Sequence, residues 1–278
     1  SFNLHMSRIL TIDQGTTSSR SIIFDQNANI QVSAQEEYPL LFPNDGWVEI
    51  QPDDLYHSVL NTLNQLDLSE IKYAGITNQR ETTIIWDRET REPIYNAIVW
   101  QDRRTSDYCE SISSDANKLL VKDKTGLIID SYFSATKIKW ILDNVEGARE
   151  KASAGKLCFG TVDSFLLFKL SNGAIHKTDI TNASRTMLFN INSLEWDKEL
   201  LELFDVPSSI LPEVEHSDAN FGALTNLNNI EVHGILGDQQ AALFGQGCLA
   251  KGELKSTYGT GCFLMANVGH TPLFSNDG

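Results

Sequence analysis

The sequence predicts an α/β fold in which a mixed β-sheet is flanked by helices, and two observations support this prediction. Residues 8–37 hold three short runs rich in β-branched and aliphatic residues, separated by turn-forming Gln, Gly, Asn and Ser. Such a pattern is typical of an antiparallel meander. Later in the chain, apolar runs of strand length alternate with segments of helical periodicity, as in α/β proteins whose helices cover a sheet. The two patterns together predict a sheet of mixed strand direction.

Each element follows from its own residue pattern. The meander strands are expected at residues 8–13, 19–25 and 30–37. In residues 53–66, apolar side chains recur at helical spacing directly after Pro52, a residue type favoured at the start of a helix. Further short apolar runs predict strands, and further helical spacing predicts helices. These strands are expected at 71–77, 82–87, 98–100, 157–161 and 231–236, and these helices at 136–144, 197–204 and 239–246.

Composition and charge limit the classes of function. The chain has 278 residues, 41% of them hydrophobic, which suits a packed globular core. Its formal net charge of −15 argues against nucleic-acid binding, because such proteins need a basic surface to neutralise phosphates. The four cysteines are scattered without CxxC spacing, so neither a zinc site nor a disulfide framework is expected. No apolar run approaches the roughly 20 residues that span a bilayer, so we expect a cytoplasmic protein without membrane insertion.

An internal similarity indicates the domain organisation. The turn Asp-Gln-Gly-Thr-Thr after Ile12 is similar to Gly-Thr-Gly at 259–261, and each joins two strand-like runs. If the second copy opens a second lobe, only about 30 residues of that lobe are present, too few to build a core. We therefore expect a first lobe at 6–249 and the truncated start of a second lobe at 250–278. Residues 1–5 are expected to be a cloning remnant.

The first group of candidate functional residues follows the first strand. Asp13 ends that strand, Gly15 permits close backbone approach, and hydroxyls follow in a turn that suits phosphate oxygens. Arg20 would add charge-assisted hydrogen bonds, and Asp13 could hold a Mg²⁺ that bridges the phosphates. The alternative is an ordinary Asp/Gly hairpin turn with surface hydroxyls. The segment is not a P-loop, because GxxxxGK[ST] does not occur.

Two further groups place carboxylates at strand ends. The buried strand that ends near residue 77 is followed by Gln79, Arg80 and Glu81, whose guanidinium and carboxylate could donate to and accept from the hydroxyls of a polyol. A solvated ion pair at the strand end is the alternative. Asp238 follows a strand and begins a predicted helix, where aspartate is a favoured N-cap. A neighbouring phosphate site would instead make Asp238 a candidate general base.

Three aromatic residues are candidates for an apolar wall against the carbon atoms of a small polyol. They are Trp100, Tyr132 and Phe263. Taken singly, each aromatic side chain is more often part of the core. The six histidines show no metal-ligand spacing such as HExxH, so no role is assigned to them.

Read together, seven segments of the chain closely resemble the glycerol kinases of the FGGY carbohydrate kinase family. The resemblance runs from residue 8 to about residue 269, and the stretch Gln-Arg-Glu-Thr-Thr is more particular to glycerol kinases than to pentulose kinases. The segments are DQGTTSSR at 13–20, GITNQRETT at 75–83, WQDRR at 100–104, GTVD at 160–163, TNASRTM at 181–187, GDQQAALFG at 237–245 and YGTGCF at 258–263.

The resemblance implies a ribonuclease H-like, actin-like fold of two similar lobes, with glycerol deep in the first lobe and ATP between the lobes. It also implies ATP-dependent phosphorylation of glycerol to sn-glycerol 3-phosphate, with Asp238 accepting the proton, and we expect the whole protein to be a homo-oligomer. Substrate binding is implied for Arg80, Glu81, Trp100, Tyr132, Asp238, Gln239 and Phe263. Contact with the nucleotide is implied for Thr16, Thr17, Ser18, Arg20 and Thr260, and Mg²⁺ binding for Asp13.

Two alternatives stay open at this point: a kinase of another small polyol or pentulose, and a non-catalytic actin-like binding module. The truncated chain is expected to have little turnover by itself, because it cannot close around ATP. A hairpin at 252–269 without the rest of its lobe is expected to expose apolar side chains such as Phe263 and Met265.

Overall fold

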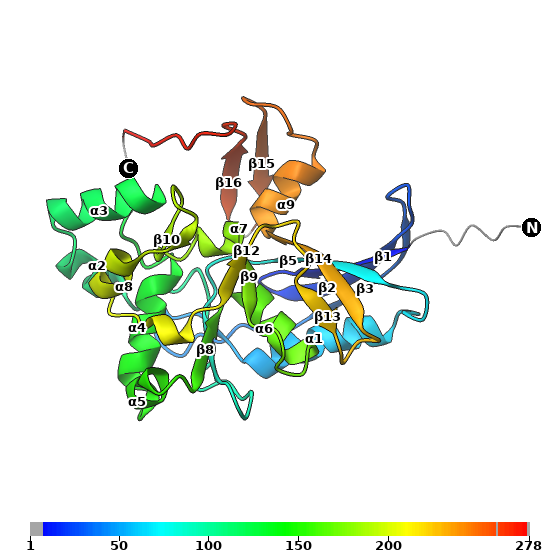
Figure 1. The fold of residues 1–278 in the computed structure, drawn as a ribbon, viewed down its shortest axis with the longest axis horizontal. Coiled ribbons are helices and arrows are strands. Elements are labelled where there is room, and N and C mark those ends of the chain that lie inside the picture. The colour runs from blue at the N-terminus through cyan, green and yellow to red at the C-terminus, as the bar shows by residue number, and fades with distance from the viewer. Residues whose placement is uncertain (1–7, 260, 277–278) are drawn as a thin grey trace, which may run out of the picture.

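A computed structural model describes residues 8–259 and 261–276 of the chain, so the predicted remnant at 1–5 lies outside the described residues. The central feature is a six-stranded sheet (Figure 1). Its strands are β1 (Ile9–Gln14), β2 (Ser18–Phe24), β3 (Ile30–Glu37), β5 (Tyr73–Asn78), β13 (Gly222–Leu224) and β14 (Ile230–Gly237). They lie in the order β13-β14-β5-β1-β2-β3.

The strand directions confirm the predicted mixed sheet. β1, β2 and β3 form the antiparallel meander, β5 is parallel to β1, β14 is parallel to β5, and β13 is antiparallel to β14. From β3 to β14, this order and these directions are those of the ribonuclease H-like fold that the resemblance implied. The last residues of the three parallel strands, Gln14, Asn78 and Gly237, are register neighbours. They form one edge of the sheet, the edge where open α/β sheets bind ligands.

One face of the sheet packs against helices. Leu10 and Ile12 of β1 point to this face and are fully buried, whereas Asp13 points to the opposite face. Helices α1 (Pro52–Asn64) and α6 (Val162–Leu170) lie below the sheet in Figure 1 and contribute to the same apolar core. Two pairs of buried hydroxyls, each 2.7 Å apart, join α1 to β2.

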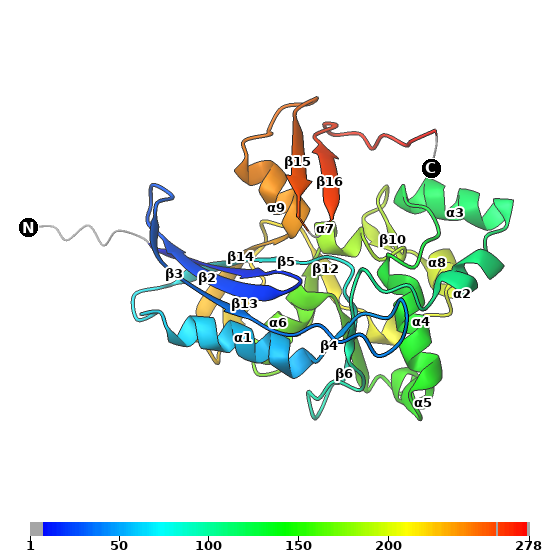
Figure 2. The same ribbon diagram turned by 180° about the vertical axis from the view of Figure 1, so that it is seen from behind.

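A second apolar core lies beside the sheet, among helices on the side away from β1–β3 (Figure 2). These helices are α2 (Ser106–Ser111), α3 (Asp115–Thr125), α4 (Ser134–Asn144), α5 (Ala148–Ser153), α8 (Lys198–Leu203) and the 3-10 turn η1 (Ser208–Ile210). Short strand pairs connect this part to the sheet. They are β4 (Glu49–Ile50) with β7 (Ala97–Ile98), β6 (Ile84–Asp87) with β8 (Leu157–Gly160), β9 (Lys177–Asp179) with β12 (Glu213–Glu215), and β10 (Phe189–Asn190) with β11 (Glu195–Trp196), with α7 (Ile180–Ala183) after β9.

The chain after the sheet forms one helix and a hairpin, which stand above the sheet in Figure 1. Helix α9 (Asp238–Gly245) is followed by the antiparallel strands β15 (Leu254–Tyr258) and β16 (Cys262–Ala266). The hairpin was expected to expose apolar side chains such as Phe263 and Met265. It does expose Leu254, Tyr258 and Leu264, but the prediction was wrong for Phe263 and Met265. Both are partly buried, because β16 packs against α9, whereas Leu264 on the opposite face is 69% exposed.

The other predicted elements are present with shifted ends. The predicted strand at 98–100 is shorter, because β7 ends at Ile98 and Trp100 lies in a turn whose backbone N–H donates to Thr82 Oγ1 at 3.3 Å. Helices α2, α3, α5, α6 and α7 were not predicted. Within residues 8–259 and 261–276, no helix has both the length and the apolar character that crossing a bilayer requires.

Candidate active site

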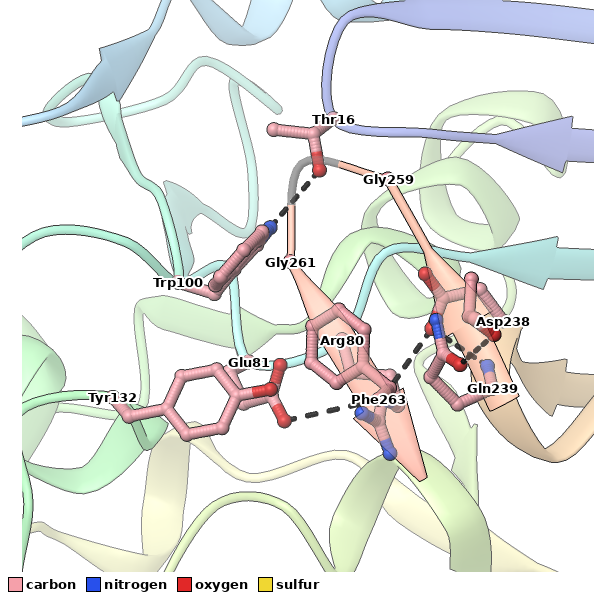
Figure 3. A pocket seen from close by; sticks show the side chains of 11 residues that line it. Thr16, Arg80, Glu81, Trp100, Tyr132, Asp238, Gln239, Gly259, Gly261 and Phe263 are labelled. Atoms are coloured by element: carbon pink, nitrogen blue, oxygen red, sulfur yellow. Dashed lines mark hydrogen bonds and ion pairs between the residues drawn. The ribbon is translucent and has the colours of Figure 1, made fainter. Parts of the chain in front are cut away.

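Side chains from distant parts of the chain line one cavity of about 120 Å³ at the carboxyl edge of the sheet (Figure 3). They come from the β1–β2 turn, the turn after β5, the loops that carry Trp100 and Tyr132, and the segment from α9 to β16. All seven residues for which substrate binding was implied line this cavity, as does Thr16. The remaining lining residues are Thr257, Gly259 and Gly261.

A strained turn directs Arg80 and Glu81 into the cavity. Glu81 has a φ of +61°, and the N–H of Thr82 donates to the Arg80 carbonyl at 2.7 Å across it. A left-handed conformation costs a non-glycine residue about 1–2 kcal/mol. The surrounding structure holds it, because the hydroxyls of Thr83 and Ser134 both donate to the Glu81 carbonyl at 2.9 Å. Strain of this kind is often found at functional sites.

Four charged groups of alternating sign cross the site. Arg80 Nε lies 3.3 Å from Asp238 Oδ1 and 3.9 Å from Glu81 Oε1, and Arg185 Nε donates to Glu81 Oε1 at 2.6 Å. The Glu81 side chain is only 2% exposed. The two guanidinium groups therefore compensate its buried negative charge. Sequence analysis gave Arg185 no role. The one indication in the sequence was that Arg185 lies in the segment at 181–187, which resembles the family. Its contact with Glu81 cannot be read from the sequence.

Asp238 is the first residue of α9, and the N-cap is Gly237. The interpretation of Asp238 as an N-cap is therefore wrong. A Cβ atom at Gly237 would lie 2.7 Å from Arg80 Cδ, so the glycine gives the arginine room to reach Asp238. Burial raises the pKa of Asp238 to about 6, with Arg80 opposing this shift and Glu81 adding to it. Most of the carboxyl is therefore ionised at pH 7 and able to accept a proton.

The three aromatic residues of the expected wall lie together in the cavity, with Trp100 and Tyr132 on the side away from Asp238 and Phe263 between them and Asp238 in the view of Figure 3. The Trp100 ring meets the rings of Tyr132 and Phe263 edge to face, with centroids 5.8 and 5.9 Å apart, a favourable aromatic geometry. Trp100 Nε1 donates to Thr16 Oγ1 at 2.9 Å, which attaches the wall to the β1–β2 turn. The Arg185 guanidinium lies 5.1 Å from the centre of the Tyr132 ring, in cation–π geometry.

Buried amide groups hold the β1–β2 turn. Gln14 Nε2 and Gln79 Nε2 donate to the Gly15 carbonyl at 2.8 and 2.9 Å, and the Tyr38 hydroxyl donates to the same oxygen. The Tyr38 oxygen in turn accepts from both glutamine side chains. This network fixes the turn and places Thr16 beside the cavity.

The other residues expected at the nucleotide do not line the cavity. Arg20 is exposed and donates to Gln35 Oε1 at 2.7 Å, and Gln35 Nε2 donates to Ser18 Oγ at 3.2 Å. Thr17 is exposed at the turn. These groups lie on the surface beside the cavity, where a ligand larger than the cavity could reach them. Thr260 lies outside the described residues.

Asp13 lies beside Arg20 of β2 and Thr77 of β5 in the sheet register, and register partners share one face. The Thr77 hydroxyl is buried without a hydrogen-bond partner among the described residues. Burial raises the pKa of Asp13, and Arg20 opposes this shift. One carboxylate beside an unsatisfied hydroxyl fits Mg²⁺, which binds through one or two carboxylates, phosphates and waters. In the described part of the chain, no cluster of three or more His, Cys, Asp or Glu could hold a metal ion.

The sheet order and the cavity at its carboxyl edge define one lobe of the ribonuclease H-like, actin-like class of folds. The profile of the N-terminal domain of the FGGY family of carbohydrate kinases matches residues 8–245, and the chain therefore belongs to that family.

Curated relatives match nearly the whole of this chain. The chain is 56% identical to a glycerol kinase of Marinomonas sp. (strain MWYL1), with 94% of this chain and 55% of the relative covered. It is 52% identical to a glycerol kinase of Borrelia duttonii (strain Ly), with 97% and 56% covered. The chain thus spans about half the length of the curated relatives it matches.

Solved structures agree with the fold. A crystal structure of Plasmodium falciparum glycerol kinase with ADP matches with a TM-score of 0.93 at 38% identity, over 98% of this chain and 56% of that one. A gluconate kinase from Lactobacillus acidophilus matches with a TM-score of 0.81 at 19% identity, over 93% of this chain and 54% of that one. The second likeness supports the fold alone.

Proposed function

We propose that this chain is the glycerol-binding lobe of an ATP-dependent glycerol kinase, with the first lobe at 6–249 and the start of the second at 250–278. The observation that carries the proposal is the cavity in which two carboxylates and a guanidinium face an aromatic wall. The cavity, of about 120 Å³, is small, which suits a small polyol better than a large ligand. The relatives named glycerol kinase support the same substrate.

The side chains of the cavity suit the two kinds of surface that glycerol presents. Glu81 and Asp238 accept hydrogen bonds from hydroxyl groups, and Arg80 donates to them. The Gln239 side chain lies beside them, where its oxygen accepts from Thr257 Oγ1 at 3.0 Å and its amide remains a donor. The aromatic wall packs against the carbon chain, and Tyr132 adds a phenol whose pKa is raised by burial, so it donates as a neutral group.

Asp238 is the proposed general base. It removes the proton from a terminal hydroxyl while that oxygen attacks the γ-phosphorus of ATP in line, and the bond from the γ-phosphorus to the β,γ-bridging oxygen breaks to release ADP. Thr16, Thr17, Ser18, Arg20 and Thr260 are proposed to contact the phosphates. Asp13 would hold Mg²⁺, which neutralises phosphate charge when bound. The remaining task of the protein is positioning and exclusion of water, since phosphoryl transfer needs no strong nucleophile.

The chain alone is expected to turn over little. A cavity on one lobe cannot exclude water from the γ-phosphate, and water would then compete with glycerol as the acceptor. Closure of a second lobe over the first supplies that exclusion in two-lobed kinases. We therefore expect glycerol binding by this chain and catalysis by the whole protein.

An assay of ADP release tests the proposal on the whole protein, with glycerol, erythritol and xylulose as acceptors. We expect glycerol to be preferred, and Asp238→Asn to lower kcat by about 10²-fold or more. Asp45→Asn is a matched control, because Asp45 is exposed and outside the cavity. A preference for xylulose would replace glycerol kinase by pentulose kinase. No ADP release with any acceptor, together with ligand binding that Asp238→Asn leaves unchanged, would indicate a non-catalytic binding module.

Location and assembly are also proposals. All four cysteines are free thiols, which supports a reducing compartment such as the cytoplasm. A homo-oligomeric whole protein rests on the family resemblance alone, and sedimentation of the whole protein would test it.

A further inference from the structure

The aromatic wall of the polyol cavity also borders a second cavity of about 510 Å³. Trp100, Tyr132, Gly261 and Phe263 line both cavities. We call the rings of Trp100, Tyr132 and Phe263 the aromatic partition, because all three line both cavities. The residues that line only the second cavity include Gln101, Arg103, Asp130 and Ser131.

Close packing keeps the aromatic partition closed. Trp100 is attached to Thr16 by its indole N–H and contacts the other two rings edge to face. A Cβ atom at Gly261 would lie 2.7 Å from Phe263 Cε2 and 3.5 Å from Trp100 Cη2. Any side chain at position 261 would therefore push the Phe263 ring away from its place. The absence of a side chain at Gly261 is a condition for the partition.

The two cavities differ in size and have similar chemistry. The first cavity, of about 120 Å³, is the smaller one, and the second, of about 510 Å³, has room for the added carbon and hydroxyl groups of a longer polyol. The second cavity offers partners for such hydroxyls, namely the side chains of Gln101, Arg103 and Asp130. Asp130 Oδ1 accepts from the Tyr132 N–H at 2.8 Å, which positions this carboxylate at the second cavity. A longer polyol that passed the aromatic partition would therefore find polar partners beyond it.

We propose that the aromatic partition sets the upper length of the substrate, so that opening it joins the two cavities and admits polyols of four and five carbons. This inference rests on the proposed function, since it concerns the same polyol cavity. Phe263 is the specificity-determining residue within the partition, because it closes the gap beside Gly261. Trp100 also donates to Thr16 of the β1–β2 turn, so a change at Trp100 would affect that turn as well as the partition.

Calorimetric titration of this chain with glycerol, erythritol and xylitol tests the proposal. We expect the unmodified chain to bind erythritol and xylitol at least tenfold more weakly than glycerol. Phe263→Ala should reduce this ratio at least tenfold by removing the ring, and Gly261→Ala should reduce it by displacing the ring. Phe263→Leu keeps most of the side-chain volume and should retain the ratio. Phe244→Ala is the control, because Phe244 is 67% exposed and lines neither cavity.

The other outcomes would overturn either this proposal or the proposed function. Equal binding of the three polyols by the unmodified chain, or an unchanged ratio in both Phe263→Ala and Gly261→Ala, overturns the proposal while leaving glycerol binding intact. Loss of all polyol binding in both variants also overturns it, because the rings would then hold the substrate without limiting its length. Failure of the unmodified chain to bind glycerol would count against the proposed function itself.

Discussion

The Nε atom of Arg80 lies 3.3 Å from Oδ1 of Asp238, and this contact joins the turn after β5 to the first residue of α9. The Arg80 side chain is only 4% exposed, so water screens its charge less than at the surface. Its positive charge lowers the pKa of Asp238 against the burial that raises it. Because Asp238 is the proposed base, this pair links the reaction rate to pH.

We predict that kcat/KM of the whole protein falls below about pH 6, because Asp238 takes up a proton near its pKa of about 6. Arg80→Met removes the opposing charge, so the fall should begin at higher pH, in addition to a general loss of rate. Arg88→Met is the control, since Arg88 is exposed and does not line the cavity. An acid limb at the same pH in Arg80→Met would show that another group controls it.

Loss of Arg185 should destabilise the fold through Glu81. The Arg185→Met variant leaves the Glu81 carboxylate buried, with Arg80 Nε at 3.9 Å as its remaining ion pair among the described residues. Removing one partner of a buried pair costs about 3 kcal/mol or more. We expect urea denaturation to show this loss. The double variant Arg185→Met, Glu81→Gln removes the charge as well and should recover part of it. A double variant less stable than Arg185→Met would contradict the coupling of the two side chains.

Tyr38→Phe should loosen the β1–β2 turn. The Tyr38 hydroxyl accepts from Gln14 Nε2 at 2.7 Å and from Gln79 Nε2 at 3.1 Å, and it donates to the Gly15 carbonyl. Leaving buried polar groups without this partner costs about 1–3 kcal/mol, which chemical denaturation would detect. Tyr258→Phe, at a side chain that is 82% exposed, should change stability by less than about 0.5 kcal/mol. Equal effects of the two changes would mean that the network is not stabilising.

Asp163 should make stability depend on pH. Burial raises its pKa to about 7, and the nearby Asp179 adds to the shift. Since this pKa lies above the unfolded value, the stability that Asp163 contributes is full below about pH 4 and is lost as pH rises to about 7. Asp163→Asn removes the charge and can still bond the Thr161 and Thr178 hydroxyls, which accept as well as donate.

The measurement is urea denaturation of both proteins at pH 5 and pH 8. We expect the stability of Asp163→Asn relative to the unmodified chain to be greater at pH 8 than at pH 5. A difference that is the same at both pH values would contradict a raised pKa of Asp163.

The sequence predicted the strands and helices that have one buried face and one more exposed face. In β1, buried and less buried residues alternate, so a strand was recognisable. Helix α6 was missed because nearly every residue from Val162 to Leu170 is buried, which leaves no apolar stripe to detect. The faces of β16 could not be assigned either, since apolar residues lie on both and only packing against α9 distinguishes them.

The candidate site was predictable where a polar residue directly follows an apolar strand. Arg80, Glu81 and Asp238 have this position at neighbouring strand ends, and the cavity contains all three. The role of Arg185 depends on a contact between distant segments, and no local pattern encodes it. The same holds for the positive φ of Glu81, because the hydroxyl of Ser134 from α4 helps to hold that turn.

A structure of this chain crystallised with glycerol tests most directly whether the cavity is the polyol site. We expect one glycerol molecule with its hydroxyl oxygens within hydrogen-bond distance of Arg80, Glu81 and Asp238, and with its carbon chain against Trp100 and Phe263. Electron density that leaves this cavity without glycerol at saturating concentration, or that places glycerol only at other surfaces, would contradict the assignment.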